Sequence, residues 1–151
     1  MPTDFVLELR NVSSLTEARF AAGEGFTHIR LSADLAGQGE AIILGIKEFL
    51  SGLALGVELD AGEPLPGWAD YAVQGKCLRA GHSEKLLAEP DEADGNAICV
   101  VEEIKGVAVA ALPLVAGLSL PSPAEYKTGF ADFEPLQNLL EEIRTHYGLE
   151  Q

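Results

Sequence analysis

Positive charge is scarce in this sequence of 151 residues. Ten lysine and arginine residues face 24 aspartate and glutamate residues, which gives a formal net charge of −14. A surface this acidic repels the phosphates of nucleic acids and the headgroups of anionic lipids. We therefore expect neither a nucleic-acid nor a membrane partner.

Long apolar runs are also missing. The most apolar stretch, Gly106 to Leu118, is too short to span a bilayer and contains Pro113. The first ten residues, MPTDFVLELR, lack the basic segment and following apolar run of a secretory signal. We expect a cytoplasmic protein.

Cysteine is rare too, since only Cys77 and Cys99 are present. Neither belongs to a CxxC motif or to the Cys/His spacing of a zinc site. The acidic turn PDEADG at 90–95 lacks the regular ligand spacing of a calcium loop. Both cysteines have apolar neighbours and are expected to be small buried hydrophobic residues. We expect no metal and no cofactor.

Residues 6–34 have the pattern of a complete β-α-β unit. Apolar and charged side chains alternate over 5–10, as in a strand with one apolar face. Ser14 and Glu17 then form the Ser-x-x-Glu capping box of a helix. A second strand is predicted over 26–31.

The rest of the chain continues this alternation. Further strands are predicted at 53–59, 70–74, 77–80, 97–101, 107–112 and 114–120. Further helices are predicted at 38–50, 83–89 and 133–147. Alternating strands and helices predict a parallel sheet with right-handed crossovers.

The length of the chain limits the architecture. With 47% hydrophobic residues, 151 residues are enough for one domain with one sizeable core, 1–151. A complete (β/α)8 barrel usually needs at least about 200 residues. We therefore predict a shortened TIM (β/α)8 barrel that has lost several connecting helices. The alternative is an open, doubly wound α/β sheet.

Two segments carry a family resemblance. Residues 8–18, ELRNVSSLTEA, precede an alanine-rich helix and GFTHI at 25–29. Residues 117–125, GLSLPSPAE, precede GFAD at 129–132 and the final helix. In this order, the two segments resemble the opening and closing motifs of the phosphoribosylanthranilate isomerase family. The resemblance covers less than half of the chain and implies a barrel with its site at the strand ends.

The chain departs from that family at the residues that carry its chemistry. Arg10 stands at the position of the family's catalytic cysteine, and a guanidinium cannot act as a general base. Ser122 matches a serine of the family's phosphate loop, but Pro123 replaces the next glycine and has no N–H to donate. Near the family's catalytic aspartate, this chain offers Glu102 and Glu103. We therefore expect an isomerase-like barrel without isomerase activity.

Several charged residues fall on the strand faces that should point into the barrel. They are Glu8, Arg10, Arg30, Glu58, Arg79 and Glu102. One interpretation is an internal ion-pair network, because unpaired buried charge is costly. The other is a site for a phosphate or carboxylate ligand at the carboxyl ends of the strands. Its candidate residues are Arg10, Arg30, Arg79, Ser119 and Ser122. The two interpretations are compatible at different depths of the barrel.

Besides a non-catalytic, isomerase-like barrel, the sequence leaves two other hypotheses open. Glu58 or Glu102 is a candidate acid/base for a sugar-phosphate isomerase or lyase, and any surviving catalysis would be an intramolecular isomerisation. The third hypothesis is a structural or partner-binding barrel. Lost helices would expose apolar strand faces over 53–74 and 97–112, which predicts a homodimer that covers them.

Overall fold

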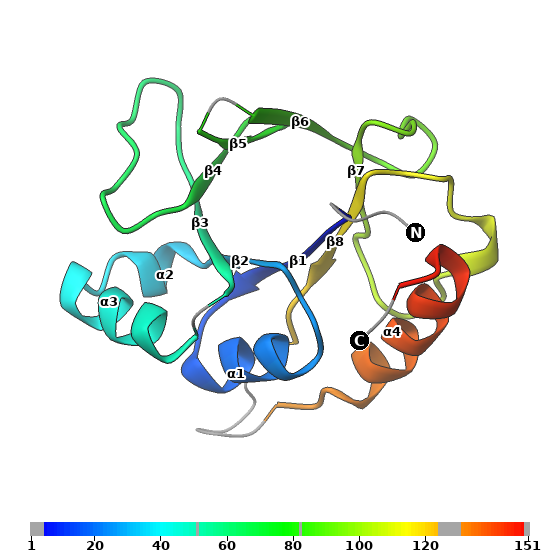
Figure 1. Ribbon diagram of the computed structural model, residues 1–151, viewed down its shortest axis with the longest axis horizontal. Helices are drawn as coiled ribbons and strands as arrows, with labels where there is room; N and C mark the ends of the chain where they lie inside the picture. The colour runs from blue at the N-terminus through cyan, green and yellow to red at the C-terminus, as the bar shows by residue number, and fades with distance from the viewer. Residues whose placement is uncertain (1–4, 51, 82, 124–130, 150–151) are drawn as a thin grey trace.

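Eight strands form a closed barrel in sequence order (Figure 1). The computed structural model describes residues 5–50, 52–81, 83–123 and 131–149. The strands are β1 (Val6–Val12), β2 (His28–Leu31), β3 (Ala54–Glu58), β4 (Tyr71–Gln74), β5 (Cys77–Ala80), β6 (Ser83–Ala88), β7 (Ile98–Val100) and β8 (Gly117–Pro121). Because β8 pairs with β1 and closes the barrel, the alternative of an open doubly wound sheet is wrong.

The barrel is mixed rather than fully parallel. Strand β5 runs antiparallel to both of its neighbours, β4 and β6, and the other neighbouring pairs in the described barrel are parallel. The reason is local: only Gly75 and Lys76 separate β4 from β5. A parallel crossover needs a dozen or more residues, whereas a two-residue turn forms a hairpin. Gly75 has the positive φ, +60°, that such turns favour.

Four α-helices and one short 3-10 helix are present in the described residues. They are α1 (Leu15–Gly23), α2 (Ala33–Ala36), α3 (Glu40–Phe49), α4 (Glu134–Tyr147) and the 3-10 helix η1 (Val109–Ala111). The Ser14 hydroxyl accepts a hydrogen bond from the Glu17 backbone N–H, as a capping box predicts, whereas the Glu17 carboxylate accepts the backbone N–H of Ser13 rather than that of Ser14. The connections from β3 to β4, from β6 to β7 and from β7 to β8 contain no α-helix.

Two predicted elements were wrong. The predicted helix at 83–89 is strand β6, where alternation places Leu87 in the barrel core while Leu86 is 54% exposed. The predicted strand at 107–112 contains only the turn η1. It lies between Gly106 and Pro113, and Val109 is buried in the apolar layer that also contains residues of α4.

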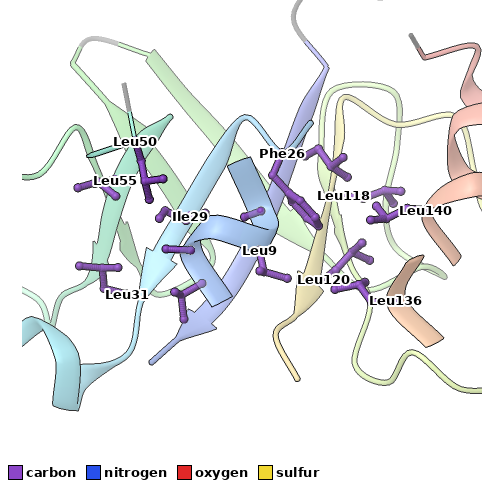
Figure 2. Packing of buried hydrophobic residues seen from close by; sticks show 14 of the residues in the cluster. Leu9, Phe26, Ile29, Leu31, Leu50, Leu55, Leu118, Leu120, Leu136 and Leu140 are labelled. Atoms are coloured by element: carbon purple, nitrogen blue, oxygen red, sulfur yellow. The ribbon is translucent and has the colours of Figure 1, made fainter. Parts of the chain in front are cut away.

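The hydrophobic core has two parts. A small cluster fills the barrel interior, with Tyr71, Val73, Leu78, Leu87 and Ile98 among its members. A larger cluster fills the layer between the barrel and the helices. Figure 2 shows members of this outer layer: Leu9, Phe26, Ile29, Leu31, Leu50, Leu55, Leu118, Leu120, Leu136 and Leu140.

The helices gather around the part of the barrel built from β8, β1, β2 and β3, whereas none of the helices in the described residues covers β4, β5 and β6 (Figure 1). The strand faces expected to be bare are largely covered, since Leu55 of β3 and Cys99 of β7 are buried in the outer layer. Large exposed apolar side chains include Leu65 in the loop before β4 and, outside the ranges 53–74 and 97–112, Leu86 and Leu114. The homodimer stays a prediction.

None of the helices in the described part of the chain is both long and apolar enough to cross a bilayer.

Candidate functional site

A cavity of about 780 Å³ opens at the carboxyl ends of β1, β2 and β3. Strands β1 to β4 and β6 to β8 run in one direction, so their carboxyl ends share one mouth of the barrel. In barrels of parallel strands, ligands bind at this end. The charged lining side chains are Arg10, Arg30, Glu58, Asp60 and Glu63.

A second cavity of about 250 Å³ lies at the same mouth. Arg10, Arg30 and Glu58 line both cavities, and Lys76, Glu89 and Glu102 are added in the smaller one. Both candidate acid/base residues, Glu58 and Glu102, therefore lie at the mouth beside the two arginines. Charges of both signs converge on this end of the barrel.

Glu8 lies below the mouth, inside the barrel, and is completely buried. Its Oε1 accepts hydrogen bonds from Arg30 Nη2 and Ser119 Oγ, both at 2.6 Å. Its Oε2 accepts from Arg30 Nε at 3.1 Å and from the Tyr71 hydroxyl at 2.7 Å. Burial opposes ionisation of this carboxyl, but the Arg30 guanidinium and the Ser119 and Tyr71 hydroxyls outweigh it and lower the pKa of Glu8.

Arg30 uses one edge of its guanidinium, Nε and Nη2, for the bidentate bond to Glu8. Burial lowers the pKa of Arg30, but the bond and the charge of Glu8 more than compensate, so that the pKa is raised. No described residue accepts a hydrogen bond from its Nη1. Because Arg30 lines both cavities, these N–H groups are donors that a ligand can use.

Arg10 is directed by a β-bulge at the end of β1. Leu9 pairs with Ile29 and Val12 with Leu31, so Arg10 and Asn11 together stand opposite a single residue of β2. Asn11 has φ +59°, and no other described non-glycine residue has a positive φ. A bulge of this kind re-aims a side chain at the rim of a barrel.

Carbonyl oxygens hold the Arg10 guanidinium. Nη1 donates to the Ser119 carbonyl at 2.7 Å, and Nη2 donates to the Val101 carbonyl at 2.6 Å. Among the described residues, no carboxylate forms an ion pair with Arg10. Burial and the nearby charge of Arg30 lower the pKa of Arg10, and Glu102 and Glu8 partly oppose this shift.

Tyr71 reaches Glu8 because β3 has no side chain in its way. A Cβ added at Gly56 would lie 2.2 Å from Tyr71 Cζ, inside the ring. The ring therefore occupies the space above Gly56, packs edge-on against His28 and is fully buried. Burial, followed by the charge and hydrogen bond of Glu8, raises the pKa of the Tyr71 hydroxyl well above its ordinary value.

The two candidate serines are engaged with carboxylates of the chain itself. The Ser119 hydroxyl donates to Glu8, and the Ser122 hydroxyl donates to Glu17 Oε1 at 2.6 Å. A serine hydroxyl has one proton to donate. In this structure neither serine has a hydroxyl proton left for a bound anion.

Glu17 accepts the hydrogen bond that the Ser122 hydroxyl donates. It is completely buried, and its Oε2 accepts from the Ser13 and Ser14 hydroxyls, both at 2.7 Å. The backbone N–H of Ser13 donates to Oε1 at 3.3 Å. The carboxylate thus joins the start of α1 to the segment after β8. The sequence pattern alone indicates Glu17 only as a capping residue.

Replacing Glu17 with alanine should lower the free energy of unfolding by about 1–2 kcal/mol, because several donors lose their shared acceptor. The cost is moderate because Ser13 and Ser14 lie near the surface and can bind water. Chemical denaturation would measure it. Glu141→Ala, on the exposed face of α4, is the control and should change stability by less than about 0.5 kcal/mol. Equal effects of the two substitutions would contradict the assigned role of Glu17.

Arg79 does not join the other candidates. Its side chain is 55% exposed and pairs with Glu84 of β6 at 3.4 Å. In β5 it is the neighbouring Leu78 that packs into the barrel interior, so Arg79 points outward. This differs from the interior position expected for Arg79.

Three residues of the site region went unrecognised in the sequence: Gly56, Tyr71 and Glu17 in its bridging role. The alternation over β4 places Tyr71 and Val73 on one face, which was a usable signal for an inward tyrosine. In the described residues, no group of three or more His, Cys, Asp or Glu side chains is arranged to hold a metal ion.

Comparisons with known proteins add no assignment. No protein-family model matches the chain, and no curated protein matches it.

Proposed function

We propose that the protein is a shortened barrel of the phosphoribosylanthranilate isomerase type that lacks isomerase activity and binds a small carboxylate or phosphate ligand at the mouth. The observation that carries the proposal is the pair Arg10 and Arg30. Both guanidiniums line both cavities, yet only Arg30 has a carboxylate bound directly to it among the described residues.

The electrostatics of this pair favour an anion. Arg10 and Arg30 lie close enough for the charge of one to lower the pKa of the other. Glu8 neutralises one positive charge, and carbonyl dipoles hold the second guanidinium in place. An anionic group between the two arginines would relieve their repulsion and use their remaining N–H donors.

Two residues stand where the resemblance implies a catalytic and a phosphate-binding group, and both support a non-catalytic role. Arg10 stands at the end of β1, where the resemblance implies a catalytic cysteine, and its guanidinium is fixed to two carbonyls. It cannot accept a proton from a substrate. Ser122, the counterpart of the family's phosphate-loop serine, is bound to Glu17.

Isothermal titration with acetate and with inorganic phosphate would test the proposal. The variant is Arg10→Gln, and Arg79→Gln is the matched control, because Arg79 is exposed on the outer face of the barrel. The native protein and the control should bind at least one of the two anions with equal affinity. Arg10→Gln should bind about 10- to 100-fold more weakly, as expected for the loss of charge-assisted hydrogen bonds.

Two results would overturn the proposal. One is that the native protein binds no small carboxylate, acetate included, and no inorganic phosphate. The other is equal affinity in Arg10→Gln and the native protein, with circular dichroism showing that both are folded. Turnover of phosphoribosylanthranilate by the native protein would overturn the non-catalytic part alone.

A further inference from the structure

We propose that the ligand of this mouth is a small zwitterion, a molecule with one carboxylate and one ammonium group, such as a free amino acid. The inference rests on the proposed function and narrows its ligand class. Its basis is the distribution of charge around the two cavities, where groups of both signs line the same space.

The larger cavity has its positive and negative groups on neighbouring strands. Arg10 and Arg30 come from β1 and β2, whereas Glu58 ends β3 and Asp60 and Glu63 follow it. With Glu8 bonded to Arg30, the chain places more negative than positive charge around this space. A phosphate dianion would be attracted by the arginines and repelled by every carboxylate that lines the same cavity.

The smaller cavity repeats the same balance. It is lined by the cationic side chains of Arg10, Arg30 and Lys76 and by the carboxylates of Glu58, Glu89 and Glu102. A ligand without net charge meets no long-range repulsion there. If it carries separated charges, it can still make charge-assisted hydrogen bonds at both ends.

Glu58 is the best placed partner for the ammonium group. It lines both cavities, and its charge helps to raise the pKa of Arg30, which places the two groups near each other. No described cation forms an ion pair with Glu58. Its side chain is exposed at the mouth, so the carboxylate is accessible. A carboxylate on the arginines and an ammonium on Glu58 would therefore belong to one short molecule.

The cavity walls also have an apolar part. Val57, Leu59, Pro66 and Trp68 line the larger cavity beside these charges. Pockets for small molecules combine apolar walls with a few polar groups that fix the orientation. This wall is suited to the side chain of an amino acid.

Three probes that differ by one group would test the inference by isothermal titration. Free alanine carries both charged groups, propionate lacks the ammonium, and ethylamine lacks the carboxylate. Alanine should bind the native protein at least about tenfold more tightly than either of the others, which corresponds to about 1.4 kcal/mol. Glu58→Gln should lower the affinity for alanine about tenfold and leave that for propionate unchanged or higher.

The outcomes separate this inference from the proposed function. Propionate or inorganic phosphate binding as tightly as alanine, with dependence on Arg10, would overturn the zwitterion and leave the anion site standing. Equal alanine affinity in Glu58→Gln and the native protein would also overturn it. Glu84→Gln, a change of the same type on the outer face, is the control and should bind like the native protein. Failure of all probes to bind would overturn both proposals.

Discussion

Replacing Glu8 with glutamine should lower the free energy of unfolding by about 3–5 kcal/mol. The carboxylate is completely buried and accepts four hydrogen bonds, two of them from Arg30. The amide would leave the Arg30 guanidinium without its counter-ion in the barrel interior and would turn an N–H group toward existing donors. Removal of one partner of a buried ion pair is costly because the other charge stays buried.

Urea denaturation would measure this loss. Glu84→Gln provides the control, because it removes the exposed partner of Arg79 and should cost less than about 1 kcal/mol. The dependence of the free energy of unfolding on pH in the acidic range gives a second measurement. Since the folded-state pKa of Glu8 is lowered, its contribution is complete above the unfolded pKa and is lost as the pH falls through the folded one. Glu8→Gln should therefore lose less stability on acidification than the native protein. A cost similar to that of Glu84→Gln would contradict the importance of the buried pair.

Gly56→Ala should be almost as damaging, with a loss of about 3 kcal/mol in the free energy of unfolding. The new Cβ would lie 2.2 Å from Tyr71 Cζ, and the ring is enclosed by the barrel. The ring would have to move away, and its hydroxyl would lose its bond to Glu8. The substitution therefore adds the cost of overpacking to the loss of a buried hydrogen bond.

Gly45→Ala is the matched control for that substitution. It lies within α3, and a Cβ there would meet no atom within 4 Å. It should stabilise the protein by about 0.5–1 kcal/mol because alanine has the higher helix propensity. A double-mutant cycle with Tyr71→Leu isolates the contact, since leucine lacks the ring atoms that clash. If Gly56→Ala costs the same in both backgrounds, the contact with Tyr71 is not the cause.

Much of the barrel could be predicted because its first half has long, regular patterns. The alternation in β1 placed Glu8 and Arg10 on the interior face, and Glu8 is indeed enclosed with Arg30. The Ser-x-x-Glu motif also located the start of α1, because it depends only on residues three positions apart. Local patterns of this kind are visible without knowledge of the rest of the fold.

The middle of the chain was harder because its elements are short. Strand β6 has adjacent leucines, Leu86 and Leu87, and only pairing with β5 and β7 decides which of them points inward. Arg79 was misplaced for the same reason, because its direction depends on the reversal of β5. The Glu17 to Ser122 bond joins residues 105 positions apart, so no local pattern could have indicated it.

The seam between β1 and β8 has a consequence for the order of folding. Strands β4, β5 and β6 are neighbours in the chain and can pair early, because short loops cost little entropy to close. The seam instead joins segments more than a hundred residues apart, and the bonds from Ser119 to Glu8 and from Arg10 to Ser119 lie across it. Arg10 therefore acquires its binding geometry only when the barrel closes. A ligand that requires this arginine therefore binds only the closed barrel. Such a ligand stabilises the closed barrel relative to the open chain.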